Sequence, residues 1–305
     1  MKPLNSAIVG LAALAFAAMV TGAAAAQGYK DKYKELVLAV VPAENASGVT
    51  ERYAGLTEYW SKETGVPVKL RIANDYAAAI EGQRSGQIHI VYYGPASFAR
   101  AIKTGVKAEA FAQDVQEDGT LGYYSVFYVK TESPYKTIRD LKGKNLGLVD
   151  PNSTSGWNVP LYELNKQGID AEVFFGKVLT TGSHENAILA LQQGTVDVVA
   201  NWWNDEQESN VMRMERKNMA KSADFRIIQK SDLIPSSPWA YMADMPEDLK
   251  KIIKDSLLEV HAKAPAVFQK LTDGKAKPFA PVTNDHYKPV VELITFVDNL
   301  KKKRS

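Results

Sequence analysis

The stretch of the chain richest in chemistry is Asp-Pro-Asn-Ser-Thr-Ser-Gly at 150–156. It follows an apolar run at 146–149 that predicts a strand, and it precedes a segment at 157–167 whose apolar positions fit one helical face. A strand ending in hydroxyl-bearing residues at a helix start offers free N–H groups, hydroxyls and the positive end of the helix dipole. The pattern predicts a site for a tetrahedral oxyanion that uses no lysine. The same residues are good helix caps and turn formers, so a plain helix start is the alternative.

Further polar and aromatic residues fall at the ends of predicted strands, where the cleft of an α/β protein would collect them. They are Tyr76, Tyr123, His184, Trp202, Trp203, Asn204 and Asp205. Packing in the core or at the rim is the alternative for each tyrosine, and His184 with Glu185 also fits a helix cap after Ser183. Two adjacent tryptophans are costly to expose, which favours a cleft wall or packing between lobes.

The sequence gives little support for an enzyme. It contains neither the G-x-S-x-G turn of hydrolases nor the nucleotide-binding motifs G-x-x-x-x-G-K-[ST] and G-x-G-x-x-G. A triad of Ser153, His184 and Asp150 lacks the G-x-S-x-G context, and the four histidines show no metal-ligand spacing. We therefore expect no catalytic residue, no metal and no cofactor.

Strands and helices alternate along the chain, which is typical of an α/β protein. Strands are predicted at 36–41, 68–72, 89–93, 146–149, 173–178, 196–200 and 226–230, and helices at 50–62, 75–86, 97–104, 185–193, 246–262 and 288–303. Units of this length imply right-handed crossovers in mostly parallel sheets.

Two crossings divide this α/β chain into two lobes. A β-rich run at 123–130 and a turn at 234–238 mark the crossings. Lobe 1 is predicted at 27–124 and 238–305, and lobe 2 at 125–237. A small ligand is expected in the cleft between them, at the carboxyl ends of strands.

The first 26 residues have the features of a signal peptide. Lys2 gives a basic start, 7–20 is almost entirely small or apolar, and an Ala-x-Ala pattern precedes Gln27. Cleavage there would leave 279 of 305 residues, with 36 basic and 35 acidic side chains. A charge so near balance argues against nucleic acid or membrane as a partner. The sequence has no cysteine and hence no disulfide, so the leader alone predicts a periplasmic protein.

An exported two-lobed chain with these motifs resembles the PhnD-like phosphonate-binding proteins of bacterial ABC importers. The resemblance spans nearly the whole mature chain and is carried by the 150–156 stretch, by His184-Glu185 downstream and by Leu-Ile-Pro at 233–235. It implies a type II periplasmic binding protein, in which two lobes joined by crossing strands close on the ligand. It also implies that the phosphonate oxygens are held by Ser153, Thr154, Ser155, His184, Tyr76 and Tyr123.

The residues facing the organic group match the family less well. Members that bind 2-aminoethylphosphonate meet its ammonium with two acidic side chains. At the corresponding places this chain has Asn204, with Asp205 next to it, and Ser237. Trp202 and its neighbour Trp203 offer a narrower pocket or a cation–π contact.

The resemblance thus predicts a monomeric periplasmic receptor that delivers phosphonates to an ABC permease, whether 2-aminoethylphosphonate or other alkylphosphonates. One alternative is a phosphate or phosphite receptor of the same fold. Another is a sensor of the same fold that reports to a membrane kinase. From a different class, the alternative is a phosphonate-processing hydrolase, which the absence of a metal site or activated nucleophile disfavours.

Overall fold

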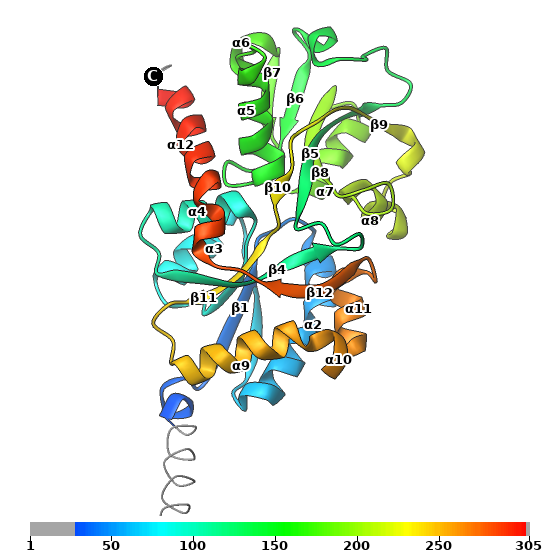
Figure 1. Ribbon diagram of the computed structural model, residues 1–305. Helices are drawn as coiled ribbons and strands as arrows, with labels where there is room; N and C mark the ends of the chain where they lie inside the picture. The colour runs from blue at the N-terminus through cyan, green and yellow to red at the C-terminus, as the bar shows by residue number, and fades with distance from the viewer. Residues whose placement is uncertain (1–27, 303–305) are drawn as a thin grey trace, which may run out of the picture.

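The computed structural model describes residues 28–302, so the predicted signal peptide lies outside the described range. Two six-stranded sheets each form the centre of one lobe (Figure 1). In lobe 1 the strands are β1 (Leu36–Val40), β2 (Val68–Ile72), β3 (Ile90–Tyr92), β4 (Ala108–Gln116), β11 (Pro238–Met242) and β12 (Ala276–Pro281). In lobe 2 they are β5 (Gly122–Lys130), β6 (Asn145–Leu148), β7 (Lys177–Thr180), β8 (Val198–Trp203), β9 (Phe225–Lys230) and β10 (Ile234–Pro235).

Helices pack around both sheets, and several begin at a polar cap. Those of lobe 1 are α2 (Ala46–Thr64), α3 (Tyr76–Arg84), α4 (Pro95–Lys103), α9 (Glu247–Leu258), α10 (Val260–Lys263) and α11 (Pro265–Thr272). Those of lobe 2 are α5 (Val159–Lys166), α6 (Ala171–Phe174), α7 (His184–Gln192) and α8 (Asn210–Arg216). Side chains of Asn45, Asp75 and Ser183 accept a backbone N–H at the starts of α2, α3 and α7. Within residues 28–302, no helix has the length and apolar character needed to cross a membrane.

The sheets are mixed, which corrects the expectation of mostly parallel sheets. The predicted strand–helix–strand units do pair in parallel: β1 lies between β2 and β3, and β6 lies between β7 and β8. The strands near the crossings pair antiparallel instead, namely β4 with β11 and β12 in lobe 1 and β5 with β8, β9 and β10 in lobe 2. The long antiparallel strands β4 and β5 carry the chain from one lobe to the other.

The strand predicted at 173–178 is wrong in its first half. The Asp170 side chain accepts a hydrogen bond from the N–H of Glu172 and caps the short helix α6. The strand β7 therefore begins only at Lys177. A local cap outweighs the apolar run here, because it satisfies a backbone donor that an extended chain would leave for the solvent.

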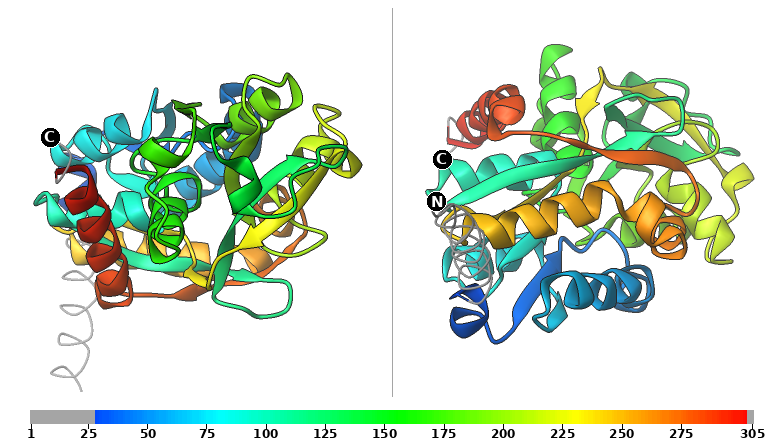
Figure 2. Two further views of the ribbon diagram at one scale, coloured as in Figure 1. Left: turned by 90° about the horizontal axis from the view of Figure 1, so that it is seen from above. Right: turned by 60° about the horizontal axis from the view of Figure 1, so that its bottom comes forward.

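The chain passes between the lobes from β4 to β5 and again from β10 to β11, where Ser236 and Ser237 form the connection. The C-terminal helix α12 (Lys288–Lys302) adds a further link, because it packs on α4 of lobe 1 and on α5 of lobe 2. Figures 1 and 2 show α12 in red beside α4.

Two kinds of contact hold α12. On α4, Arg100 and Lys103 form ion pairs with Asp298 at 2.5 and 3.0 Å. On α5, the ring of Tyr162 meets the ring of Phe296 edge to face, with 5.4 Å between centroids. Charged contacts thus join α12 to lobe 1, and an aromatic contact joins it to lobe 2.

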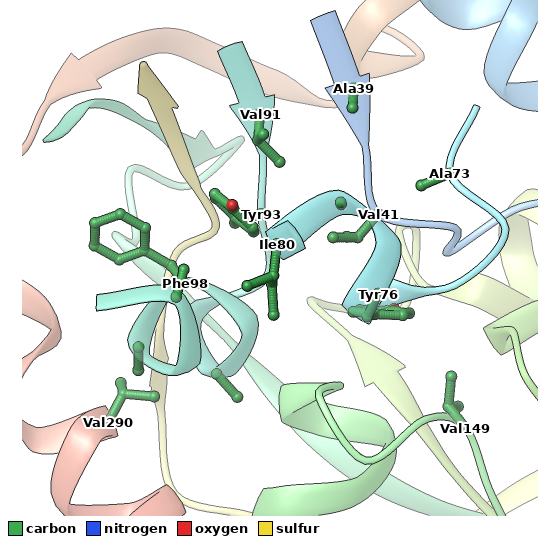
Figure 3. Close-up of a cluster of buried hydrophobic side chains, with 14 of the residues drawn as sticks. Ala39, Val41, Ala73, Tyr76, Ile80, Val91, Tyr93, Phe98, Val149 and Val290 are labelled. Carbon is green, nitrogen blue, oxygen red and sulfur yellow. The ribbon is translucent and has the colours of Figure 1, made fainter. Parts of the chain in front are cut away.

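A hydrophobic cluster runs through both lobes and anchors the inner wall of the cleft. It includes Val41, Tyr76 and Val91 of lobe 1 and Val149 of lobe 2 (Figure 3). The Tyr76 side chain is only 2% exposed, so its ring is fixed by packing on all sides. This packing places the phenol oxygen at one position in the cleft.

Candidate ligand-binding site

The 150–156 stretch forms the turn between β6 and α5. Ser153 Oγ accepts a hydrogen bond from the N–H of Gly156 at 3.1 Å, and Thr154–Asn158 then winds as one π-helical turn before α5. Single π-helical turns are rare and concentrate at functional sites. The turn brings Ser153, Thr154 and Ser155 to the carboxyl end of β6, and all three side chains are buried.

A cavity of about 150 Å³ lies at this turn, between the two lobes. Since a single water needs only about 10–15 Å³ by this measure, the cavity has room for a small ligand. Most of the residues predicted from sequence line it: Tyr76, Tyr123, Ser153, Thr154, Ser155, His184, Trp202, Asn204 and Ser237.

Asp205 is not among the lining residues. Its carboxylate accepts hydrogen bonds from the N–H groups of Gln207 and Glu208, at 2.7 and 2.8 Å. The side chain therefore caps the tight turn that follows β8. The same turn holds Asn204 at the cavity, where its Nδ2 donates to Oε1 of Gln116 across the cleft at 2.6 Å.

Two tyrosine hydroxyls complete the polar end of the cavity. Burial raises the pKa of Tyr123 to about 12, while hydrogen bonds with Thr154 and Ser155 act in the opposite direction. Burial also raises the pKa of Tyr76, which lies within hydrogen-bond reach of Ser153. Both phenols keep their protons at neutral pH, so each can donate to an oxyanion.

The threonine of the turn also bonds to the facing lobe. Thr154 Oγ1 accepts a hydrogen bond from the N–H of Ala96 at 2.8 Å. Ala96 lies in the first turn of α4, where backbone N–H groups have no partner within the helix. The turn at 150–156, which we call the oxyanion turn after its predicted role, thus contacts a helix N-terminus of lobe 1.

His184 lies behind the turn as a neutral imidazole. Burial lowers its pKa to about 4, although the bond to Asn201 acts to raise it. Nδ1 lies 2.8 Å from Oδ1 of Asn201, whose Nδ2 donates to the carbonyl of His184 at 3.0 Å. The Oδ1 atom of Asn201 can only accept a hydrogen bond, so the ring proton of His184 is on Nδ1. Nε2 is then an acceptor, and it lies 3.3 Å from Oγ of Ser153.

For a dianionic ligand, which the sequence predicts, we expect a proton to enter the site together with the ligand. The Ser153 hydroxyl lies next to the acceptor Nε2 of His184, and a hydroxyl that donates to the ring is not free to donate to the ligand. A proton gained by the ring or by a ligand oxygen would release this hydroxyl to bind the dianion. At a pH high enough to ionise methylphosphonate twice, we expect uptake of about one proton per bound ligand. Titration calorimetry in buffers of different ionisation enthalpy measures this number. An uptake of zero would show that Nε2 does not meet the ligand.

Charged residues bridge the lobes at the edge of the same cavity. Glu44 of lobe 1 pairs with Arg52 of its own lobe at 2.8 Å, and with Lys217 and Arg213 of lobe 2 at 2.6 and 3.5 Å. Arg213 also lies 3.5 Å from Asp273 of lobe 1. Further pairs join Arg216 to Asp273, Arg213 and Arg216 to Glu208, and Lys217 to Glu185. We call this set the interlobe ion network.

The sequence analysis missed several cavity residues, of which Asp114 is the most informative. It lies on β4 and accepts a short hydrogen bond from the hydroxyl of Tyr92. In the sequence, Asp114 is the one charged residue at 110–115, where the other residues are apolar or glutamine. No strand was predicted there. Two other lining residues, Ser236 and Trp239, carry the buried atoms Oγ and Nε1, which have no hydrogen-bond partner among the described residues. Buried polar atoms normally have a partner, so each of these two atoms can bond to a ligand atom or a water in the cavity.

A cavity enclosed by two α/β lobes that are linked by crossing strands defines a type II periplasmic binding protein. The model of the family described as "ABC transporter, phosphonate, periplasmic substrate-binding protein" matches residues 38–287. The chain therefore belongs to this family, whose members bind solutes for ABC transporters and are not enzymes.

Relatives and solved structures agree with this assignment. The chain is 31% identical over 275 residues to the phosphonates-binding periplasmic protein of Escherichia coli K12, covering 88% of this chain and 78% of that protein. It is 27% identical over 270 residues to the phosphate-import protein PhnD of Mycolicibacterium smegmatis, covering 83% and 82%. The binding component of an ABC phosphonate transporter from Pseudomonas aeruginosa superimposes with a TM-score of 0.78 at 28% identity, covering 87% and 86%.

Proposed function

We propose that this protein captures phosphonates in the periplasm and delivers them to the permease of an ABC importer. One observation carries the proposal: the turn at Ser153–Ser155 presents neutral donors to a cavity that extends well beyond it. Neutral donors at a strand end, near a helix start, complement a dianion without an ion pair. The remaining volume leaves room for a group on phosphorus.

Each lining residue has a proposed part. Hydroxyls and amides of Ser153, Thr154 and Ser155 hold the phosphonate oxygens, and Tyr76 and Tyr123 donate from the opposite side. His184 takes the proton that enters with the ligand. The organic substituent then lies near Trp202, Asn204 and Ser237, while Asp205 shapes the turn that positions Asn204.

A phosphate receptor is the second candidate, because one relative is named for phosphate import. The cavity weighs against it. Phosphate would use the oxyanion end and leave the part near Trp202 and Ser237 without ligand contacts. Titration of the mature protein with methylphosphonate, phosphite and phosphate separates the candidates, and a preference for phosphate over methylphosphonate would contradict the proposal.

The change Thr154→Val tests the oxyanion turn. Valine keeps the shape but removes a hydroxyl from the cavity wall, along with the acceptor for the N–H of Ala96. We expect methylphosphonate to bind about 1–3 kcal/mol more weakly, or roughly 5- to 150-fold. Calorimetric titration gives the affinity. The matched control is Thr131→Val, which removes an exposed hydroxyl bonded to Ala223 on the surface and should leave the affinity unchanged.

The location and the assembly state complete the proposal. We propose that residues 1–26 direct export and are then removed, and that the mature protein works as a monomer. Release of a ligand that the closed lobes enclose requires them to open, which is the step that docking on a permease would promote.

A further inference from the structure

Asp114 is an acidic residue of the cavity lining that the proposed phosphonate site does not use. It lies on β4, close to where the chain crosses to lobe 2, and its half-buried side chain faces the cavity. Its hydrogen bond from the Tyr92 hydroxyl fixes one carboxylate oxygen. Among the described residues, no lysine or arginine forms an ion pair with Asp114 at 4.0 Å or less.

The other acids of the cavity are already neutralised. Glu44 and Glu208 belong to the interlobe ion network, where each meets at least two cationic side chains. Burial raises the pKa of Asp114 to about 6, although the bond from Tyr92 and the charge of Arg213 act to lower it. A carboxylate that burial disfavours to this extent gains from a cation beside it.

The surroundings of Asp114 suit an ammonium group. The rings of Tyr53, Tyr92 and Trp239 also line the cavity, with centroid separations of 4.6 Å for Tyr92 and Trp239 and 6.3 Å for Tyr53 and Tyr92. Aromatic faces attract cations, most strongly where water is excluded. Ser236 Oγ, on a residue only 1% exposed, lines the same cavity and has no partner among the described residues. It can accept one ammonium hydrogen.

Asp114 and Asn204 line the same cavity, from lobe 1 and lobe 2 respectively. Asn204 donates across the cleft to Gln116, which lies two positions after Asp114 on β4. Residues two apart on a strand point to the same face, so the side chains of Asp114 and Gln116 lie on one face of β4. A ligand that extends along this face of β4 therefore passes Asp114.

We infer that Asp114 recognises an ammonium group on the ligand, so that the chain binds aminoalkylphosphonates through a carboxylate on lobe 1. This inference rests on the proposed phosphonate site and adds the class of its organic substituent. The negative charge that meets the ammonium is then on the lobe 1 wall of the cleft. The zwitterionic ligand would then bridge the lobes, with its phosphonate on lobe 2 and its ammonium on lobe 1.

The test compares ethylphosphonate with 2-aminoethylphosphonate, two ligands that differ by the amine. The wild-type protein should bind the amine-bearing ligand about 30-fold or more tightly, since a buried charge pair is gained. The change Asp114→Asn keeps the size and the acceptor for Tyr92 but removes the charge. It should abolish this preference while changing the affinity for ethylphosphonate by less than about threefold.

The matched control is Asp31→Asn, which removes an exposed carboxylate that does not line the cavity and should retain the preference. The inference is overturned if the wild type binds both ligands equally, or if Asp114→Asn weakens both to the same extent. Because ethylphosphonate has no amine, its binding by the wild type tests the phosphonate site alone. If neither ligand binds, the proposed function itself fails; if ethylphosphonate binds without any preference for the amine, only the role of Asp114 fails.

Discussion

The change Glu44→Gln is expected to lower the free energy of unfolding by about 3–5 kcal/mol, since it removes one member of a buried ion cluster. The Glu44 side chain is 10% exposed and lies between Arg52, Arg213 and Lys217. A neutral amide would leave these cations with too little negative charge in a region shielded from water. Urea unfolding at pH 7 gives the comparison.

The pH dependence of the free energy of unfolding gives a second test of the role of Glu44. Burial acts to raise the pKa of Glu44, but the charges of Arg213 and Arg52 and the bond from Lys217 outweigh it and bring the pKa to about 2. Because the folded value is below the ordinary value of 4.5, the stabilisation is present above pH 4.5 and is lost as the pH falls towards 2. Glu58→Gln, on the exposed side of α2, is the control. A loss no larger than that of Glu58→Gln would contradict a structural role for the network.

The change Gly156→Ala should abolish ligand binding at concentrations where the wild type is saturated. A Cβ on Gly156 would lie 2.5 Å from Cβ of Val149 and 2.9 Å from Oγ of Ser153, and it would also meet Cγ2 of Val149. Val149 is fully buried in the cluster that joins the lobes, so it has little room to move. We therefore expect the π-helical turn to shift and the donors of Ser153 and its neighbours to lose their alignment.

We expect Gly156→Ala to weaken methylphosphonate binding by about 100-fold or more. Overpacking should also lower the free energy of unfolding by about 1–3 kcal/mol. Calorimetric titration and urea unfolding measure the two effects on the same sample. The control is Gly28→Ala, where no atom lies within 4 Å of the added methyl group. Wild-type affinity in Gly156→Ala would show that the turn tolerates displacement and does not set the ligand geometry.

The oxyanion turn could be predicted from sequence because its signals are local. The strand, the hydroxyl-bearing residues and the following helix are consecutive in the chain, and capping chemistry depends only on near neighbours. Ser153, Thr154 and Ser155 accordingly lie at a strand end beside a cavity. The leader, in contrast, lies outside the described residues, and its role stays a prediction.

The residues that sequence reasoning missed are placed by long-range pairing. Asp114 reaches the cavity because β4 pairs with β11 and β12, more than a hundred residues away in the chain. No local pattern marks such a strand, since only the pairing shows which of its faces meets the cleft. Asp205 is the opposite case, because a local pattern suggested a role that the structure does not give it. Asp205 follows Asn204 in the sequence, but its carboxylate accepts hydrogen bonds from backbone N–H groups of its own turn.

The position of α12 has a mechanical consequence for the opening of the cleft. In Figure 1, α12 lies on one side of the molecule, whereas α8 and α11, near the interlobe ion network, lie on the other. Rotation of the lobes would keep α12 on α4 through the ion pairs of Asp298. It would move α12 over α5, where Phe296 and Tyr162 are held by an aromatic contact and not by an ion pair. The helix α12 would then allow the two lobes to slide past each other and would resist their separation. A protein fused after α12 would load this helix, so a tag intended to leave lobe motion undisturbed belongs at the other end of the described chain, before Gly28.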